Sequence, residues 1–440
     1  MTTLTSAQLD KIAACIFILG DRKTTRLKRP VTFQTLAFEN AMDPIASDAD
    51  FQKVGIGIID FTGNKTSPNI RLIQGEKAFR IGSTTKIAMM LAAVQLRTDV
   101  RNILGLTPQI ITTPAEFDAL YANAALWKKG KAPRRNFADR IAKVPPLISK
   151  IFDFTKSPVD FAGPDPDTQH LPANHDKAFD KLHGESAWDS DPPLSFAEHF
   201  WMTGLMSDNV AATTCMSKIG VPYLKAVMRA YGLFEHPDGG MHLLTSAEYE
   251  TIPTVKKKTT DPPLPRRLTD AEFPEVDDKW LSSPGRYDDK RSWVTGSAAA
   301  LTAYMIALVN DGFAIPNTPG ATGAAACTTI RNNLADGGNH SIHSYVVGDS
   351  TSGIKKVARV TKQFNKIGLL QHDIGAEVDI ISEFVYVETE EKIVPPAGKR
   401  NAMQYAIVVA GMRSDASNDF DAKTNRLAET VHVALSKLPI

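Results

Sequence analysis

Cysteine, net charge and long apolar runs are all scarce in this 440-residue chain. Its three cysteines, Cys15, Cys215 and Cys327, lie far apart and form no C-x-x-C or Cys/His spacing, so neither a disulfide framework nor a structural zinc site is expected. The formal net charge is +1, which excludes a whole-chain attraction to nucleic acid or to a membrane surface. No apolar run reaches the length of a membrane span. The expected partner is therefore a small molecule, and the sequence does not set the oligomeric state.

A targeting signal is also not evident. In KIAACIFILG, the residues Ile12 to Cys15 resemble a lipoprotein cleavage box, but such a box ends an apolar segment, and the preceding MTTLTSAQLDK is polar and carries Asp10. We therefore expect a cytoplasmic protein, with export by this route as the less favoured alternative. The composition, 43% hydrophobic and 22% charged, is that of an ordinary globular protein large enough for a substantial core.

Segments near both ends of the chain have the pattern of β-strands. KVGIGIIDFT and IRLIQ, separated by the turn GNKTSPN, predict a hairpin, and KQFNKIGLL, EVDIISEFVYVE and MQYAIVVAGM alternate in the last third. A closing amphipathic helix is predicted for AKTNRLAETVHVALSKL. We expect an α+β protein with one catalytic domain over 1–440, whose sheet region comprises 1–80 and 340–440.

The region 81–339 is expected to be helical. FRIGSTTKIAMMLAAV predicts a buried helix beginning near Ser83, because almost nothing polar follows Lys86. Ser195 and Glu198 have capping-box spacing and predict a helix from about Phe196. Further helices are predicted for VAATTCMSKIG, closed by its glycine, and for GSAAALTAYMIALVNDG. Proline-rich stretches at about 100–193 and 252–294 predict surface insertions, the first with a helix or two in PAEFDALYANAALW.

The start of the central helix carries a pair of residues that suggests chemistry. Ser83 and Lys86 lie three residues apart and thus on one helix face. A serine hydroxyl needs a base to act as a nucleophile, and burial favours the neutral lysine amine that can accept a proton. The helix N-terminus adds a backbone N–H and a dipole that favour negative charge. S-x-x-K alone is common, however, and a solvated helix start explains it as well.

The order of three motifs strengthens the chemical interpretation. Ser83-x-x-Lys86 follows a predicted hairpin, Ser207-Asp208-Asn209 follows an apolar helix, and Lys366-Ile367-Gly368 lies in a strand near the C-terminus. With these motifs the chain resembles the serine β-lactamase and penicillin-binding protein superfamily over nearly its whole length, class A β-lactamases most closely. The resemblance implies a serine β-lactamase/transpeptidase-like fold, with an antiparallel sheet built from both chain ends, an all-helical region, and an active site in the groove where they meet.

The resemblance implies catalytic roles for four residues. Ser83 is expected to be the acylated nucleophile, Lys86 its base or proton relay, Ser207 the group that passes the proton onward, and Lys366 a source of positive potential. Taken singly, Ser207 is better explained by capping of the following helix, and Lys366 is better explained as a solvated strand residue.

Three residues are expected to bind substrate by the same resemblance. Asn209 would hold the substrate amide or the Lys86 ammonium, although it too is a common helix-capping residue type. Gly368 and Leu369 would line the substrate position, and the backbone N–H groups of Ser83 and Leu369 would form the oxyanion hole.

The chain departs from the family pattern in ways that bear on substrate. Ile367 stands where the family usually has a hydroxyl that binds a substrate carboxylate, and Glu377 aligns by eye with an arginine of the same role on the next strand. An anionic substrate end is therefore disfavoured there. The loop glutamate of class A enzymes has no clear counterpart: four candidates by position are Glu248, Glu250, Glu272 and Glu275, and a solvated loop carboxylate is the favoured explanation for each. Deacylation through Lys86 and Ser207, or slow deacylation, remains open.

Two other groups of residues carry less weight. His170, His175 and His183 with Glu185 lie in a Pro- and Asp-rich segment without a helical ligand pair, so solvated histidines are favoured over a metal site. His372 and Asp373 follow the third motif and either form a turn or contact substrate.

The expected function is that of a serine hydrolase that forms an acyl-enzyme on Ser83 with a small amide or ester, without metal or cofactor. The alternatives are a true β-lactamase and a covalent penicillin-binding or sensor protein that does not turn over.

Overall fold

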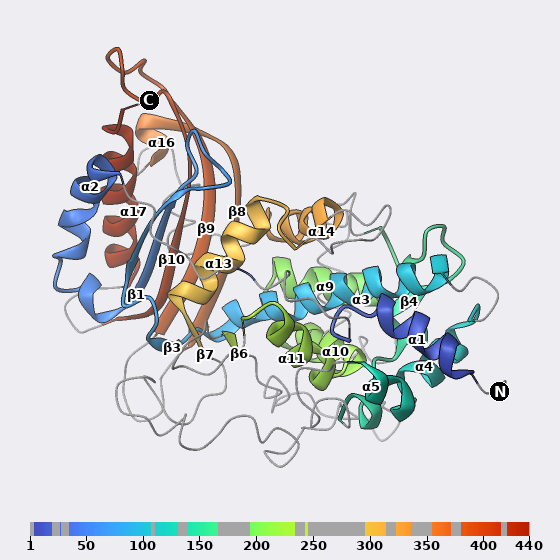
Figure 1. Ribbon diagram of the computed structural model, residues 1–440. Coiled ribbons are helices and arrows are strands. Elements are labelled where there is room, and N and C mark those ends of the chain that lie inside the picture. Colours follow the sequence, from blue (N-terminus) through green and yellow to red (C-terminus); the bar gives the residue numbers. More distant parts are fainter. Residues whose placement is uncertain are drawn as a thin grey trace.

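The computed structural model of the protein describes residues 4–19, 27, 35–106, 111–130, 140–165, 194–233, 243–244, 295–313, 323–335, 354–370, 380–414 and 420–439. A sheet with two covering helices forms one side of the molecule, and a group of helices forms the other (Figure 1).

The main sheet has five strands in the order β2-β1-β10-β9-β8. They are β1 (Gly55–Asp60), β2 (Asn69–Ile73), β8 (Ala358–Leu370), β9 (Ile380–Glu391) and β10 (Ala402–Arg413). All neighbouring strands are antiparallel, and β1 pairs with β10 so that Ile58 lies opposite Ile407. This confirms the prediction that both ends of the chain build one antiparallel sheet. Strand β8 is at the edge of the sheet.

Both faces of this sheet are covered. Along β10, the side chains of Tyr405, Ile407 and Val409 pack into an outer core with α2 (Leu36–Ala46) and α17 (Phe420–Ser436). The residues that alternate with them point to the other face of the sheet and pack into the core shared with the inner helices. Figure 1 shows α2 and α17 side by side on the outer face and α13 (Ala298–Val309) on the inner face. The sheet is therefore the central layer, between two helical layers.

The inner helices surround α3 (Lys86–Leu106), in which every side chain from Ile87 to Val94 is buried. Around it lie α9 (Phe196–Leu205), α10 (Asn209–Ile219), α11 (Val221–Ala230) and α14 (Gly323–Ala335). The Ser195–Glu198 capping box that predicted the start of α9 is present, and α10 ends at Gly220, whose φ of 81° suits a glycine. These helices were all predicted except α11 and α14.

One part of the predicted division of the chain is corrected. The sequence analysis placed residues 1–80 with the sheet, but α1 (Ser6–Cys15) packs against α3 and α5 (Ala124–Lys129) in the helical layer. The Phe17 ring stacks on Tyr231 at 4.5 Å between centroids, and the Phe17 N–H donates to Asp99 Oδ1 at 3.1 Å. An amphipathic helix such as α1 must bury its apolar face. Other helices already cover both faces of the main sheet, so α1 packs on α3 instead.

The remaining elements are short. A three-stranded sheet has the order β3-β7-β6, with β3 (Ala78–Arg80), β7 (Thr295–Ser297) and β6 (Leu243–Leu244). The first insertion contains α4 (Pro114–Tyr121), α5, α7 (Ile148–Ile151), and the paired strands β4 (Phe152–Asp153) and β5 (Asp160–Phe161). The elements η1 (Phe51–Lys53), η2 (Gly82–Thr85) and α16 (Ile354–Val357) complete the description. The second insertion, 252–294, lies outside the described residues.

Candidate active site

Ser83 lies in η2, the tight turn that connects β3 to α3. The α-helix begins at Lys86, so Ser83 is in a 3₁₀ turn just before the helix rather than within its first turn as predicted. Thr84 Oγ1 donates to the carbonyl of Ser382 on β9 at 3.1 Å, and Thr85 Oγ1 donates to the carbonyl of Gly82 at 2.9 Å. These bonds fix the turn against the sheet, with Ser83 partly exposed.

The Lys86 amine is buried, with the residue only 1% exposed. Its Nζ donates to the carbonyl of Ser207, to Asn209 Oδ1 at 2.7 Å and to Ser207 Oγ at 3.3 Å. Burial lowers the pKa of Lys86 to about 7, although the charge of Asp208 raises it. Near neutral pH this amine is therefore able to accept a proton.

Ser207 connects α9 to α10 in a backbone conformation that is uncommon for serine. Its φ is 56°, in the left-handed region. Asp208 caps α10 by accepting the Ala211 N–H at 2.7 Å, and its own N–H donates to the carbonyl of Met202 at 3.1 Å. With the chain fixed on both sides, Ser207 presents its carbonyl and its hydroxyl to the same neighbouring amine, as the bonds from Lys86 show.

Lys366 reaches the same hydroxyl from the edge strand β8. Its Nζ donates to Ser207 Oγ at 2.6 Å and to the carbonyl of Ile367 at 2.9 Å, and the residue is only 2% exposed. Burial, and then the charge of Lys86, lower the pKa of Lys366 well below its ordinary value, while Glu383 raises it. Two amines from distant parts of the sequence thus meet at one serine oxygen.

Gly368 lets β8 approach the turn that holds Ser83. A Cβ at this position would lie 2.1 Å from the carbonyl oxygen of Ile81 and 2.7 Å from the N atom of Thr84. Any larger residue would push the strand away from η2. Leu369 follows at the same edge with 40% of its surface exposed.

The structure brings most of the predicted residues into one group. Lys86, Ser207, Asn209 and Lys366 are joined by direct hydrogen bonds, and Gly368 packs on the Ser83 turn. The Ser83 hydroxyl makes no hydrogen bond to a residue in the described part of the chain; the Lys86 backbone N–H donates to the Ser83 carbonyl. The Lys86 side chain is instead occupied by Ser207 and Asn209.

Sequence reasoning missed a buried carboxylate next to this group. Glu383 on β9 lies directly opposite Ile367, is fully buried, and accepts a hydrogen bond from Asn365 Nδ2 at 3.2 Å. The available signal was a charged residue inside the otherwise apolar run IISEFVYV. Glu377, which the sequence analysis aligned with a family arginine, lies outside the described residues.

Several other predicted candidates fall where the structure gives no description: His170, His175, His183, Glu185, Glu248, Glu250, Glu272, Glu275, His372 and Asp373. Within the described ranges, no group of three or more His, Cys, Asp and Glu residues is placed to hold a metal ion. In the same ranges, no helix is both long and apolar enough to cross a bilayer.

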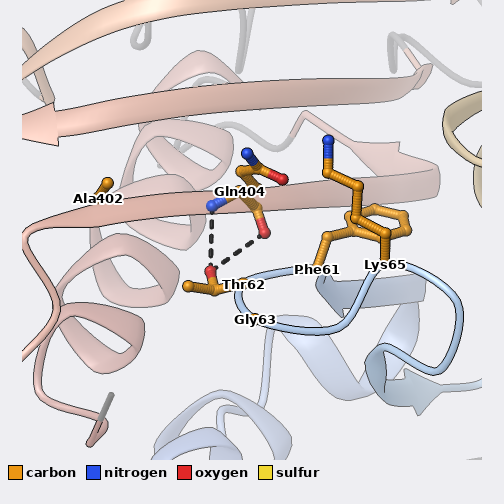
Figure 2. Close-up of a pocket in the computed structure, with 6 residues that line it drawn as sticks. All are labelled: Phe61, Thr62, Gly63, Lys65, Ala402 and Gln404. Carbon is orange, nitrogen blue, oxygen red and sulfur yellow. Dashed lines mark hydrogen bonds between the residues drawn. The ribbon is translucent and has the colours of Figure 1, made fainter.

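A hollow of about 340 Å³ lies elsewhere, beyond the end of β1 and the start of β10 (Figure 2). Figure 2 shows Thr62 bridging to the Gln404 backbone, whose N–H donates to Thr62 Oγ1 at 3.0 Å, with Lys65 and Phe61 beside it. Of its six lining residues, Lys65 alone carries charge. Gln404 pairs with Glu388 on β9, whereas Lys366 pairs with Phe384, so the hollow and the two amines lie at different levels of the sheet.

Comparison with known proteins gives a likeness in structure alone. No protein-family model matches the chain, and no curated protein sequence matches it. Among solved structures, an ancestral class A β-lactamase is 14% identical with a TM-score of 0.39, covering 90% of this chain and 96% of its own. A β-lactamase from Xanthomonas campestris is 14% identical with a TM-score of 0.40, covering 91% and 96%, and one from Burkholderia phymatum is 15% identical with a TM-score of 0.37, covering 90% and 96%. The roles assigned to individual residues rest on the side-chain geometry described above.

Proposed function

We propose that this protein is a serine hydrolase that forms an acyl-enzyme on Ser83 with a small amide or ester. The observation that carries the proposal is the environment of Lys86: a buried amine with a pKa of about 7, three residues after Ser83, hydrogen-bonded to a second hydroxyl.

The side chains supply the groups for a proton route that starts when Ser83 turns toward Lys86. Ser83 Oγ attacks the substrate carbonyl and its proton passes to the Lys86 amine, while backbone N–H groups of Ser83 and Leu369 stabilise the oxyanion. Ser207, bonded to both amines, then relays this proton from Lys86 to the leaving amine or alkoxide as the bond between the carbonyl carbon and the leaving group breaks, which leaves Lys86 neutral again. In the second half, water attacks the acyl-enzyme and gives a proton to Lys86, and Lys86 returns it to Ser83 Oγ as the ester bond breaks and the acid is released.

The substrate class follows from the residues beside this route. The partly exposed apolar residues Leu369 and Met206 flank the site residues in sequence, whereas the Ile367 side chain packs against the outer core. No hydroxyl donor for a carboxylate is present at Ile367. A neutral amide or ester with an apolar acyl group therefore suits the site better than one carrying an anionic end.

Intact-protein mass spectrometry tests the proposal directly. The protein is exposed in turn to a fluorophosphonate, a p-nitrophenyl ester and a panel of β-lactams. The wild type should gain one adduct from the fluorophosphonate, and Ser83→Ala should gain none. Ser149→Ala, which removes an exposed serine hydroxyl remote from the site, is the matched control and should react like the wild type. A wild type that gains no adduct from any reagent contradicts the proposal.

Turnover assays combined with these mass spectra separate the two alternatives. Turnover of a chromogenic cephalosporin, lost in Ser83→Ala, would identify a β-lactamase, whereas turnover of p-nitrophenyl esters alone fits the general hydrolase. A stable adduct on Ser83 without turnover would identify a covalent binder or sensor.

A further inference from the structure

One end of the main sheet gathers exposed apolar side chains. Because neighbouring strands are antiparallel, β1 and β9 end where β2, β8 and β10 begin. The first residue of α2, the residue before β8, the connection between β9 and β10, and the last turn of α17 all lie at this end. Of the eight large apolar residues that are exposed in the described part of the chain, these places hold five: Leu36, Val357, Ile393, Val394 and Val433.

The connection between β9 and β10 projects from this end. Figure 1 shows it at the top of the molecule, beyond the ends of α2 and α17. Ile393 and Val394 lie in it with 83% and 82% of their surface exposed, the highest values among those eight residues. Both neighbours are exposed because the chain has passed beyond the helical layers that cover the two faces of the sheet.

The stem of this hairpin is fixed to the body of the protein. Arg400 is buried, and its guanidinium donates to Asp60 Oδ2 at 2.9 Å and to the carbonyl of Pro439 at 3.1 Å. The Glu391 N–H donates to the carbonyl of Asn401 at 2.8 Å, which continues the pairing of the two strands. A stem held in this way keeps the two apolar side chains of the tip away from the core, so their exposure is a property of the fold.

The charge that accompanies these apolar residues is mainly positive. Among carboxylates, Glu39 in the first turn of α2 and Glu390 near the end of β9 each lie 4.0 Å from an arginine, and Asp60 is buried against Arg400. The side chain of Glu391 is 13% exposed. The chain as a whole has a formal net charge of only +1, but this end carries four exposed lysines: Lys65, Lys392, Lys399 and Lys437.

An anionic bilayer surface matches this combination. Apolar side chains enter between the lipid headgroups, while lysine stems lie along them and place their ammonium groups at the phosphates. Pro395 and Pro396 follow the apolar pair directly and bring no backbone N–H into the interface. A protein partner would have to supply a concave surface for a projecting tip and bury about 1,200 Å² in total, whereas lipids rearrange around the tip.

We propose that this end of the sheet binds an anionic membrane surface, with Ile393 and Val394 inserted among the lipid headgroups and the four lysines facing the lipid phosphates. The candidate active site does not face the bilayer in this orientation. Gly368, which packs on the Ser83 turn, lies toward the opposite end of β8 from Ala358, at a distance of about 30 Å for an extended strand. Binding therefore holds the protein at the membrane and leaves Ser83 accessible.

Sedimentation with lipid vesicles tests this proposal on the full chain. The bound fraction is measured with vesicles of phosphatidylcholine alone and of phosphatidylcholine mixed with phosphatidylserine, at low and high salt. The wild type should bind the mixed vesicles about 10-fold more tightly, and salt should weaken that binding. The double substitution Ile393→Ser and Val394→Ser should weaken it about 10-fold or more, and Lys392→Gln with Lys399→Gln should weaken it by a similar factor.

Two control variants remove the same chemistry elsewhere. Leu147→Ser removes an exposed apolar side chain from the helical part of the molecule, and Lys53→Gln removes an exposed lysine at the opposite end of the main sheet. Neither should change vesicle binding, and circular dichroism should show every variant folded.

A wild type that binds neither kind of vesicle overturns the proposal, and so does undiminished binding in the Ile393 and Val394 double variant. Gel filtration adds a third outcome. If the double variant loses self-association that the wild type shows without vesicle binding, the tip contacts a second copy of the chain and the membrane proposal is wrong. No readout here uses Ser83, so the result is independent of the function proposed above.

Discussion

Helix α3 buries two basic side chains about three turns apart, and their surroundings differ. Arg97 is 2% exposed, and its guanidinium donates to Asp160 Oδ1 at 2.8 Å and to Thr329 Oγ1 at 2.6 Å. Arg101 adds a second ion pair to Asp160 at 3.3 Å, and the Phe161 ring covers the Arg97 guanidinium. Lys86 is as deeply buried, but its described hydrogen bonds go to neutral oxygens of Ser207 and Asn209.

The difference separates a charge buried for structure from the amine to which we assign a catalytic role. An arginine stays charged and its planar donors match a carboxylate, so the Arg97 group ties α3 to β5 and α14. Burial lowers the pKa of Lys86 to about 7 although the charge of Asp208 raises it, so this amine can exchange its proton near neutral pH. The two sites should therefore respond in opposite ways when their basic group is removed, one in reaction rate and the other in stability.

The largest effect is expected for Lys86→Met. Without the amine, nothing accepts the Ser83 proton, and the rate of Ser83 labelling by a fluorophosphonate should fall by about 10³-fold. The free energy of unfolding should change by less than about 1 kcal/mol. The substitution removes the free-energy cost of burying the amine, and this gain offsets the loss of its hydrogen bonds. Labelling kinetics and urea denaturation on the same preparation measure both; unchanged labelling in Lys86→Met would refute the assignment of the base.

Arg97→Met should have the reverse profile. It leaves the Asp160 carboxylate buried with a partly exposed Arg101 as its remaining ion-pair partner, and the free energy of unfolding should fall by about 3 kcal/mol. The folded fraction should still label Ser83 at the wild-type rate, because the Lys86 group is untouched. Urea denaturation measures the free energy of unfolding, and Ser83 labelling is measured at urea concentrations below the unfolding transition, where the protein is folded. A large loss of labelling in the folded state would show that the two sites are coupled.

The sequence predicted this scaffold well because its signals are local. The hairpin β1–β2, the capping box of α9, the Gly220 end of α10 and the strand pattern of β8 to β10 each depend on residues close together in the chain. The motif residues Lys86, Ser207 and Lys366 also fell into one group, as the resemblance implied. The start of α3 was misjudged because a 3₁₀ turn and an α-helix share the same N-terminal residue types.

What the sequence did not provide depends on strand register. The Glu383 carboxylate lies behind Lys366 only because β9 pairs with β8 so that Ile367 faces Glu383, and a shift of one residue would place it on the other face. The packing of α1 on α3 is likewise a tertiary contact that no local pattern in the first twenty residues indicates.

The pH dependence of stability gives a third, smaller test of the contrast. The folded pKa of Lys86 is lowered to about 7 from 10.5, so between these values the unfolded chain binds more protons than the folded one. Stability must then rise with pH above 7, by up to about 1.4 kcal/mol per pH unit. Relative to Lys86→Met, the wild type should gain about 1 kcal/mol between pH 7 and 8, measured by urea denaturation. Arg97→Met should show no such gain relative to the wild type, since an arginine stays protonated throughout.

The smallest effect concerns the scaffold alone and asks whether any loss of stability disturbs the chemistry. Ser195→Ala removes the N-cap of α9, whose hydroxyl accepts the Glu198 N–H at 3.3 Å, and should cost about 1 kcal/mol. Because α9 leads into Ser207, a general loosening would reach the site through this helix if stability and reactivity were linked. We expect a lower melting temperature and an unchanged rate of Ser83 labelling. If the melting temperature and the labelling rate fall together in Ser195→Ala, a loss of stability alone can slow labelling. The slower labelling of Lys86→Met would then no longer identify Lys86 as the base, and the contrast between Lys86 and Arg97 would weaken.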